Sequence, residues 1–162
     1  MNIEKENIPL IPKLYCIRYI EGGCAKNKCT AVKLKNLNLL KIVSKIYGSL
    51  KKSIILNPLA KKEISSKDRE IILKNGLIVI DCSWKHFFTI KNLDEDVSRK
   101  LPPLIAANPV NYGKWEKLSS AEALSAALYI TGFRERAILI LSKFSWGREF
   151  FRINNFEINN IY

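Results

Sequence analysis

The stretch LIVIDCSW, residues 77–84, decides the fold of this chain. Its first four residues, Leu77 to Ile80, are all apolar, as in a strand that is covered on both faces of a parallel sheet. From Asp81 onward the residues are an acid, a thiol, a hydroxyl and an indole. Because ligands bind beyond the carboxyl ends of parallel strands, this change predicts a functional site directly after the strand.

Further strands and helices alternate on both sides of this stretch. The apolar pattern predicts strands at 14–20, 53–57 and 104–107, and helical spacing at 34–43. A helix is expected from about Ser65 to Gly76, because a capping oxygen and an acid both favour a first turn. This alternation predicts an α/β fold with a largely parallel sheet.

Unusual residues follow each predicted strand, at the edge where a ligand would bind. They are Gly22-Gly23, Asn57-Pro58, 81–84 and Asn108-Pro109. One such coincidence carries little weight, but four at the same edge predict a site there.

The last third of the chain is predicted to be helical. Ser119 and Glu122 have the spacing of a capping box, and the helix that they open would end at Gly132. A second helix fits 134–144. A third would place on one face Phe151, Asn154, Ile158 and Ile161. We therefore predict an α/β unit at 1–104 and a helical unit at 105–162, with the boundary between about 101 and 113.

The charge balance indicates a polyanionic partner. The 162 residues carry 27 Lys and Arg against 15 acids, a formal charge of +12. Nucleic acid and an anionic membrane surface both fit this excess. No apolar run reaches the ~18 residues of a membrane span, and the first nine residues lack the apolar core of a signal peptide. We expect a cytoplasmic protein whose cysteines stay reduced.

Several kinds of site are disfavoured. Cys24 and Cys29 make half a metal site, and His86, the one histidine, does not complete it, so no metal is expected. Phosphate-binding glycine motifs are absent, and the single histidine disfavours a Ser-His-Asp arrangement. Nucleotide hydrolysis and simple hydrolase chemistry are therefore disfavoured.

A set of segments resembles one family in order and spacing. They are Lys28-Cys29-Thr30, Leu56-x-Pro58, Asp81-Cys82-Ser83-Trp84, 101–113, 122–130, Phe144-Ser145-Trp146-Gly147-x-x-Phe150 and Asn154. Over about 15–162 the chain resembles the small-subunit ribosomal RNA aminocarboxypropyltransferases of archaea and eukaryotes. The segments 106–113 and 81–84 are the most specific part of the match.

The resemblance implies a knotted fold like that of the SPOUT methyltransferases, with S-adenosylmethionine bound at the knot. Periodicity does not predict a knot, which is an exception to the rule that chains do not thread their own loops. Members of the family transfer the 3-amino-3-carboxypropyl group of S-adenosylmethionine to N3 of a hypermodified pseudouridine, with or without an N1-methyl group, during ribosome biogenesis. The leaving group is methylthioadenosine.

The family pattern also implies roles for residues that bind the donor. Leu56, Pro58 and Trp84 would surround its S-methyl group, and Thr30 would hydrogen-bond its methionine end. Trp84 as ordinary core and Thr30 as a helix N-cap are the alternatives. Backbone would line the adenosine near Ile80, Leu104, Ser119 and Ala123.

Asp81 is the candidate catalytic residue. The N3–H of the base must lose its proton to attack, and a nearby carboxylate would accept or orient that proton. The alternative is that Asp81 caps the turn after its strand.

RNA contacts are expected from a cluster of lysines near the predicted site: Lys26, Lys28, Lys33, Lys35, Lys85 and Lys91. The chain departs from the family where an Asp-Pro usually precedes the Lys-Cys-Thr segment, since it has Ala25-Lys26 there. Two other functions remain open, a SPOUT-type RNA methyltransferase and a non-catalytic ribosome assembly factor. We expect a monomer.

Overall fold

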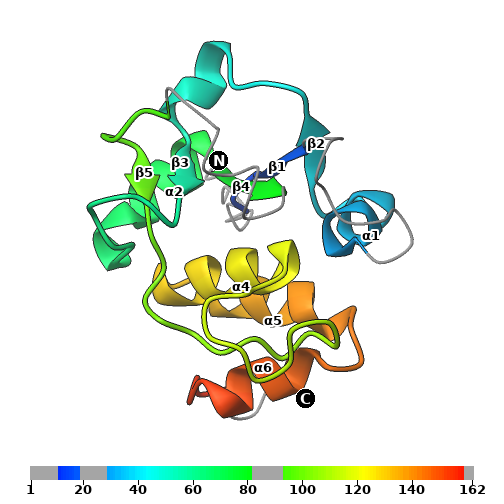
Figure 1. The fold of residues 1–162 in the computed structure, drawn as a ribbon. Coiled ribbons are helices and arrows are strands. Elements are labelled where there is room, and N and C mark those ends of the chain that lie inside the picture. Colours follow the sequence, from blue (N-terminus) through cyan, green and yellow to red (C-terminus); the bar gives the residue numbers. More distant parts are fainter. Residues whose placement is uncertain (1–10, 19–28, 82–92, 159–162) are drawn as a thin grey trace, which may run out of the picture.

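The computed structural model describes residues 11–18, 29–81 and 93–158. Five strands form one parallel sheet in the order β2-β1-β4-β3-β5 (Figure 1). The strands are β1 (Leu14–Arg18), β2 (Lys41–Val43), β3 (Ile54–Leu56), β4 (Leu77–Asp81) and β5 (Ser98–Arg99). The predicted α/β class with a parallel sheet is confirmed.

The helices form a layer on one face of this sheet. They are α1 (Thr30–Asn36), α2 (Arg69–Asn75), α4 (Ser120–Ile130), α5 (Arg134–Ser142) and α6 (Gly147–Ile153), and a 3-10 turn at Ser66–Asp68 precedes α2. A second 3-10 turn, Gly48–Lys52, lies on the opposite face, where its Leu50 packs against the small apolar cluster (Figure 1). Figure 1 shows α4 next to the sheet and α5 and α6 beyond it. No helix in the described ranges is long and apolar enough to cross a membrane.

Strand alternation assigns each side chain of β4 to one of two cores. Leu77 and Val79 join the large apolar cluster that α4 and α5 complete, whereas Ile78 belongs to a small cluster on the opposite face. Successive side chains of a strand point to opposite faces. Asp81 therefore lies on the same side as Leu77 and Val79, facing the helical layer.

The predicted helix starts at Ser65 and Ser119 are confirmed, and each of them is a capping box. Ser65 pairs with Asp68 ahead of α2, and Ser119 pairs with Glu122 at the start of α4. After α2 the chain turns at Gly76, whose φ of +94° favours glycine. A Cβ at this position would come within 2.9 Å of the Lys13 carbonyl oxygen, so β4 can approach β1 closely only with glycine there.

Two predicted elements are wrong. The helical spacing at 34–43 is broken at Asn38, which takes a φ of +57°, and 41–43 is strand β2, in register beside β1. The segment 104–107 is not a strand of the sheet, because only Ile105 forms a bridge, an antiparallel one to Trp115. The edge position beside β3 belongs to β5 instead.

The third predicted helix is shifted. It begins at Gly147 and ends at Ile153, so Asn154 and Ile158 follow it rather than lying on its face. Asn154 is used differently: its side chain accepts from the N–H of Ile105 at 2.8 Å and donates to the Ile105 carbonyl at 2.9 Å. Ile161 lies outside the described residues.

The sheet and the helical layer share one apolar core. Leu77 of β4, Leu124 of α4 and Ile140 of α5 belong to the same cluster of buried residues. The division into units at 1–104 and 105–162 stays a prediction.

Candidate functional site

The strand order predicts where a ligand would bind. Strand β1 is followed in the chain by β2 on one side of the sheet, whereas its neighbour β4 is followed by β5 on the other side. In open parallel sheets such a reversal opens a crevice at the carboxyl ends of the two strands, and ligands bind there. The reversal between β1 and β4 lies at Arg18 and Asp81, which are paired residues in the register.

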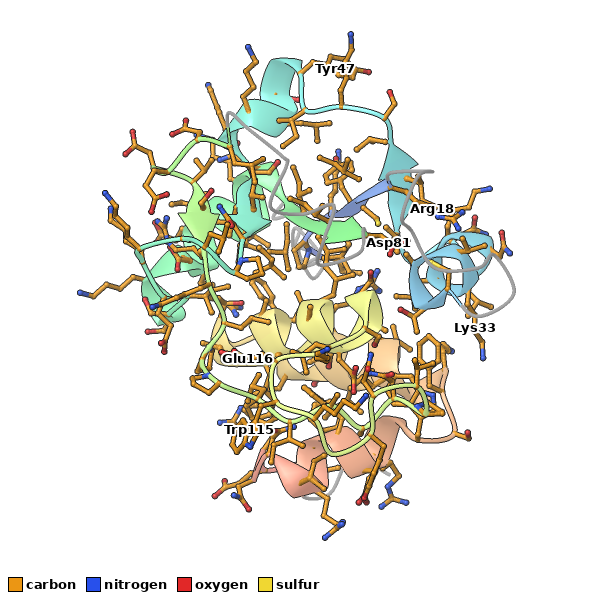
Figure 2. The ribbon with its side chains drawn as sticks, viewed as in Figure 1. Arg18, Lys33, Tyr47, Asp81, Trp115 and Glu116 are labelled. Carbon is orange, nitrogen blue, oxygen red and sulfur yellow. The ribbon has the colours of Figure 1, made fainter. Side chains whose placement is uncertain are left out.

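These two strand ends carry an ion pair. Nε of Arg18 lies 3.4 Å from Oδ2 of Asp81, and both side chains are largely buried, with exposed fractions of 18% and 11%. Figure 2 shows Arg18 and Asp81 close together at this edge, near the start of α1. The preceding residues of β4, Leu77 to Val79, belong to the apolar clusters, so the charges lie where the two strands end.

Two buried thiols lie beside the same carboxylate. Sγ of Cys29 donates a hydrogen bond to Oδ2 of Asp81 at 3.1 Å. Burial, and next the charge of Asp81 and the neighbouring Cys29, raise the pKa of the Cys16 thiol well above its usual range. Cys16 is therefore a neutral, buried thiol rather than a nucleophile. Among the described residues no group of three or more Cys, His, Asp or Glu is arranged to hold a metal ion.

A second polar network lies at the start of α4. Glu122 is fully buried, and its Oε1 accepts from the backbone N–H groups of Ala107 and Asn108 at 2.6 and 3.0 Å. Its Oε2 accepts from Nδ2 of Asn108 at 2.8 Å and from the N–H of Ser119 at 2.7 Å. These donors stabilise the buried charge and fix the segment that runs through Asn108 onto the helix.

Comparison with known proteins identifies the family. Residues 54–161 match the family described as "Ribosome biogenesis protein, C-terminal". The 16S rRNA aminocarboxypropyltransferase of Methanocaldococcus jannaschii is 41% identical over 145 residues, covering 89% of this chain and 83% of the relative. The chain belongs to this family. The enzyme of the same name from Methanosphaera stadtmanae is 43% identical over 140 residues, covering 84% and 81%.

A solved structure extends the similarity to the fold. The SAM-dependent rRNA:acp-transferase Tsr3 from Vulcanisaeta distributa superposes with a TM-score of 0.81 at 39% identity, covering 90% of this chain and 79% of that one. The parallel sheet and helical layer described above are thus the fold of an aminocarboxypropyltransferase family member.

Thr30 and Ser119, two residues with expected roles, both lie next to the first turn of α4. The hydroxyl of Thr30 accepts from the N–H of Ala121 at 3.1 Å, so it caps α4 rather than its own helix. The N-cap of α1 is Cys29, which makes no side-chain capping bond. The hydroxyl of Ser119 accepts from the N–H of Glu122 at 3.2 Å.

The apolar residues with expected roles divide between the two faces of the sheet. Leu56 and Leu104 are buried in the large cluster, and Ala123 packs against it. Ile80 packs in the small cluster on the other face, so its side chain points away from these three. Pro58, just beyond β3, is exposed.

Several predicted residues lie outside the described part of the chain: Trp84, Ala25, Lys26, Lys28, Lys85 and Lys91. Of the other two lysines, Lys35 is exposed on α1. Lys33 donates to the Lys143 carbonyl at 2.7 Å, and its ammonium lies 4.9 Å from the centre of the Phe144 ring. It therefore ties α1 to the turn after α5.

Sequence reasoning missed two of the charged or polar partners of Asp81. Arg18 lies on the same face of β1 as Leu14 and Cys16, so alternation along the strand predicts that its side chain faces the helical layer. Its pairing with Asp81 also needs the knowledge that β1 and β4 are neighbours, which no local pattern supplies. Cys29 stood inside a recognised motif, but nothing there indicated that its thiol donates to this carboxylate.

Proposed function

We propose that this chain transfers the 3-amino-3-carboxypropyl group of S-adenosylmethionine to small-subunit ribosomal RNA. One observation carries the proposal: the chain matches a SAM-dependent rRNA:acp-transferase over 90% of its length at a TM-score of 0.81 and 39% identity. The curated relatives, named 16S rRNA aminocarboxypropyltransferases, agree with it.

The residues around the carboxyl edge of the sheet fit such a donor. S-adenosylmethionine carries a positive sulfonium, an apolar methyl group and a charged amino-acid arm. Leu56 and Leu104, buried in one cluster, offer an apolar surface for the methyl group and the adenosine, with Ala123 beside them. The hydroxyls of Thr30 and Ser119 each accept one backbone hydrogen bond, and a hydroxyl that accepts can still donate to the methionine carboxylate.

Trp84 completes this pocket in the proposal, together with Leu56 and Pro58. An indole face against a sulfonium contributes about 1–2 kcal/mol of cation–π attraction when water is excluded. The pocket would hold the methyl group away from the RNA and present the γ-carbon of the methionine arm. The backbone near Ile80, Leu104, Ser119 and Ala123 would line the adenosine.

Asp81 is the proposed catalytic residue. The base nitrogen attacks the γ-carbon, a C–N bond forms, the C–S bond breaks, and methylthioadenosine leaves. The proton released from the base passes to a carboxylate or to water, and Asp81 would accept or orient it. The ion pair with Arg18 and the hydrogen bond donated by the Cys29 thiol fix the rotamer of Asp81. A carboxylate held in one position favours an in-line reaction.

The finer assignments belong to the same proposal. The acceptor atom is N3 of a pseudouridine, with or without an N1-methyl group, the donor lies at a SPOUT-like knot, and the protein acts as a monomer in the cytoplasm. A cofactor unit at 1–104 and a helical unit at 105–162 complete it. The long-range bond between Thr30 and Ala121 supports the view that the donor lies between the two units.

Nucleoside mass spectrometry of small-subunit RNA tests the substrate and the transferred group. A strain without this gene is compared with the same strain that carries the gene or the Asp81→Asn variant. The proposal predicts that one pseudouridine loses the mass of one aminocarboxypropyl group when the gene is absent, and that the gene restores it. Unchanged RNA would contradict the proposal, and the loss of a methyl mass instead would identify a methyltransferase.

A further inference from the structure

The loop between β5 and α4 presents two aromatic rings to solvent. Tyr112 is 58% exposed and Trp115 is 60% exposed, beside Val110 at 71%. Exposed lysines lie next to the indole along the chain, Lys114 before it and Lys117 after it. We call these five residues the aromatic platform.

The platform is held rigidly although it is exposed. Backbone bonds join the N–H of Gly113 to the Ala106 carbonyl at 2.8 Å and the N–H of Glu116 to the Leu104 carbonyl at 2.8 Å. Gly113 and Glu116 both have positive φ, +79° and +60°. A non-glycine residue in this region costs about 1 kcal/mol or more and persists only where the surroundings hold it.

Two buried side chains provide that support from below. The carboxylate of Glu122 holds Ala107 and Asn108, and the amide of Asn154 holds Ile105, which is bridged to Trp115. The hydroxyl of Tyr112 also donates to Oε1 of Glu149 at 3.0 Å, which fixes one edge of that ring. A partner that binds here would not have to order the loop first.

We propose that the aromatic platform stacks unpaired bases of the substrate ribosomal RNA. This inference rests on the proposed function only for the identity of the RNA. Tyr112 and Trp115 are three residues apart, a span of at most about 10 Å, which lies within reach of one RNA loop. Aromatic rings that stack bases, interleaved with cations that meet phosphates, are typical of surfaces that bind single-stranded RNA.

The lysines favour RNA over a protein partner. Tyr and Trp are frequent at protein interfaces as well, but lysine is depleted there. Glu149 is near Tyr112 but is paired with Arg152, so its charge is balanced locally. Lys114 and Lys117 outnumber Glu116 on the loop itself, and the chain as a whole carries +12.

The platform lies apart from the predicted reaction site. Figure 2 shows Trp115 beside the outer helices and Asp81 at the sheet. RNA bound at both places would be held at the reacting base and again at a neighbouring unpaired segment. The platform would therefore add affinity for folded ribosomal RNA without taking part in the transfer.

Fluorescence anisotropy with labelled oligouridine, and with an RNA duplex as comparison, tests the proposal. Trp115→Ala should weaken binding of the single strand by about tenfold, since stacking contributes about 1–3 kcal/mol per base. Trp115→Phe should retain most of the affinity, and duplex binding should not change in either variant. Tyr47→Ala is the matched control, because Tyr47 is also 60% exposed but lies at the opposite end of the molecule (Figure 2).

Turnover with small-subunit RNA separates this proposal from the proposed function. Trp115→Ala should raise KM for RNA and leave kcat unchanged. A wild-type chain that releases no methylthioadenosine would contradict the proposed function, and the anisotropy result would still decide the role of the platform. Wild-type affinity of Trp115→Ala for oligouridine would overturn the proposed role of the platform in RNA binding.

Discussion

The carboxyl edge of the sheet and the start of α4 both bury a carboxylate, but they use it differently. Both oxygens of Glu122 are occupied by backbone and amide donors from the same short region of the chain. Among the described residues, Asp81 meets the guanidinium of Arg18 and the thiol of Cys29, where the strand order reverses.

This difference separates a carboxylate that builds the fold from the one that we propose takes part in the chemistry. Backbone donors cannot move without unfolding the segment that carries them, so Glu122 serves as a structural anchor. Side-chain partners at a strand end can exchange for a substrate group without disturbing the core. The comparison therefore predicts that the two carboxylates respond in opposite ways to the same substitution.

Glu122→Gln should give the largest effect, on stability. The new amide nitrogen would face the N–H of Ser119 or the amide of Asn108, donor against donor, in a fully buried place. Hydrogen bonds to a charged group contribute about 1.5–3 kcal/mol each, so we expect a loss of about 3 kcal/mol. Urea unfolding measures it, with exposed Glu135→Gln as the control. An unfolding midpoint equal to the wild-type value would refute the anchor role.

Asp81→Asn should give the second largest effect, on the reaction rate. We expect kcat for the transfer to fall about 100-fold, as for the loss of a general base. The stability loss should be about 1–2 kcal/mol, because the amide oxygen can still accept from the Cys29 thiol. Methylthioadenosine release measures the rate, and Asp96→Asn, at an exposed carboxylate, is the control. If Asp81→Asn unfolded the protein as strongly as Glu122→Gln but left kcat unchanged, the roles of the two carboxylates would be reversed.

Thr30→Val tests the hydrogen bond that joins the start of α1 to the start of α4. The substitution keeps the shape but removes the hydroxyl that accepts from Ala121. We expect about 1 kcal/mol less stability and about tenfold weaker binding of S-adenosylmethionine, because a hydroxyl for its methionine end is lost. Calorimetric titration measures the affinity. Thr30→Ser keeps the hydroxyl and should bind like the wild type; equal affinity of both variants would exclude Thr30 from the donor site.

The smallest effect concerns Glu149, a carboxylate at the surface. Hydrogen bonds, first from Arg152 and then from Tyr112, lower the pKa of Glu149 from 4.5 to about 2. Because this pKa is lower in the folded state, the stabilisation is present above pH 4.5 and is lost as the pH falls toward 2. The stability difference between wild type and Glu149→Gln should shrink over that range. A difference that is constant with pH would show that the contact contributes nothing in solution.

The sequence predicted the parts of the fold that have local signals. Ser65, Gly76, Ser119 and Gly132 mark helix ends by capping and by positive φ, and they lie where expected. The strand at 41–43 was missed because Leu34, Leu37 and Leu40 continue a helical spacing, and only pairing with β1 makes the next residues extended. The two-residue strand β5 is too short to show any period.

The sequence predicted a candidate site at the carboxyl edge of the sheet, but it did not predict which residues contact one another there. Asp81 followed from the abrupt end of an apolar run, and the family resemblance supplied Thr30, Ser119 and Ala123. Arg18 could not be paired with Asp81 from sequence, because the paired residues of β1 and β4, such as Tyr15 and Ile78, lie 63 positions apart in the chain. The anchoring role of Glu122 beyond its capping box was hidden for the same reason, since its other partners lie 14 and 15 residues away.

The most direct test follows two labelled carbons of S-adenosylmethionine into small-subunit RNA. One preparation carries the label in the methionine carboxyl group, and the other carries it in the S-methyl group. The proposed transfer predicts that the carboxyl label appears in RNA, while the methyl label leaves with methylthioadenosine and Asp81→Asn slows both. Methyl label in the RNA, with the carboxyl label retained in S-adenosylhomocysteine, would contradict the account.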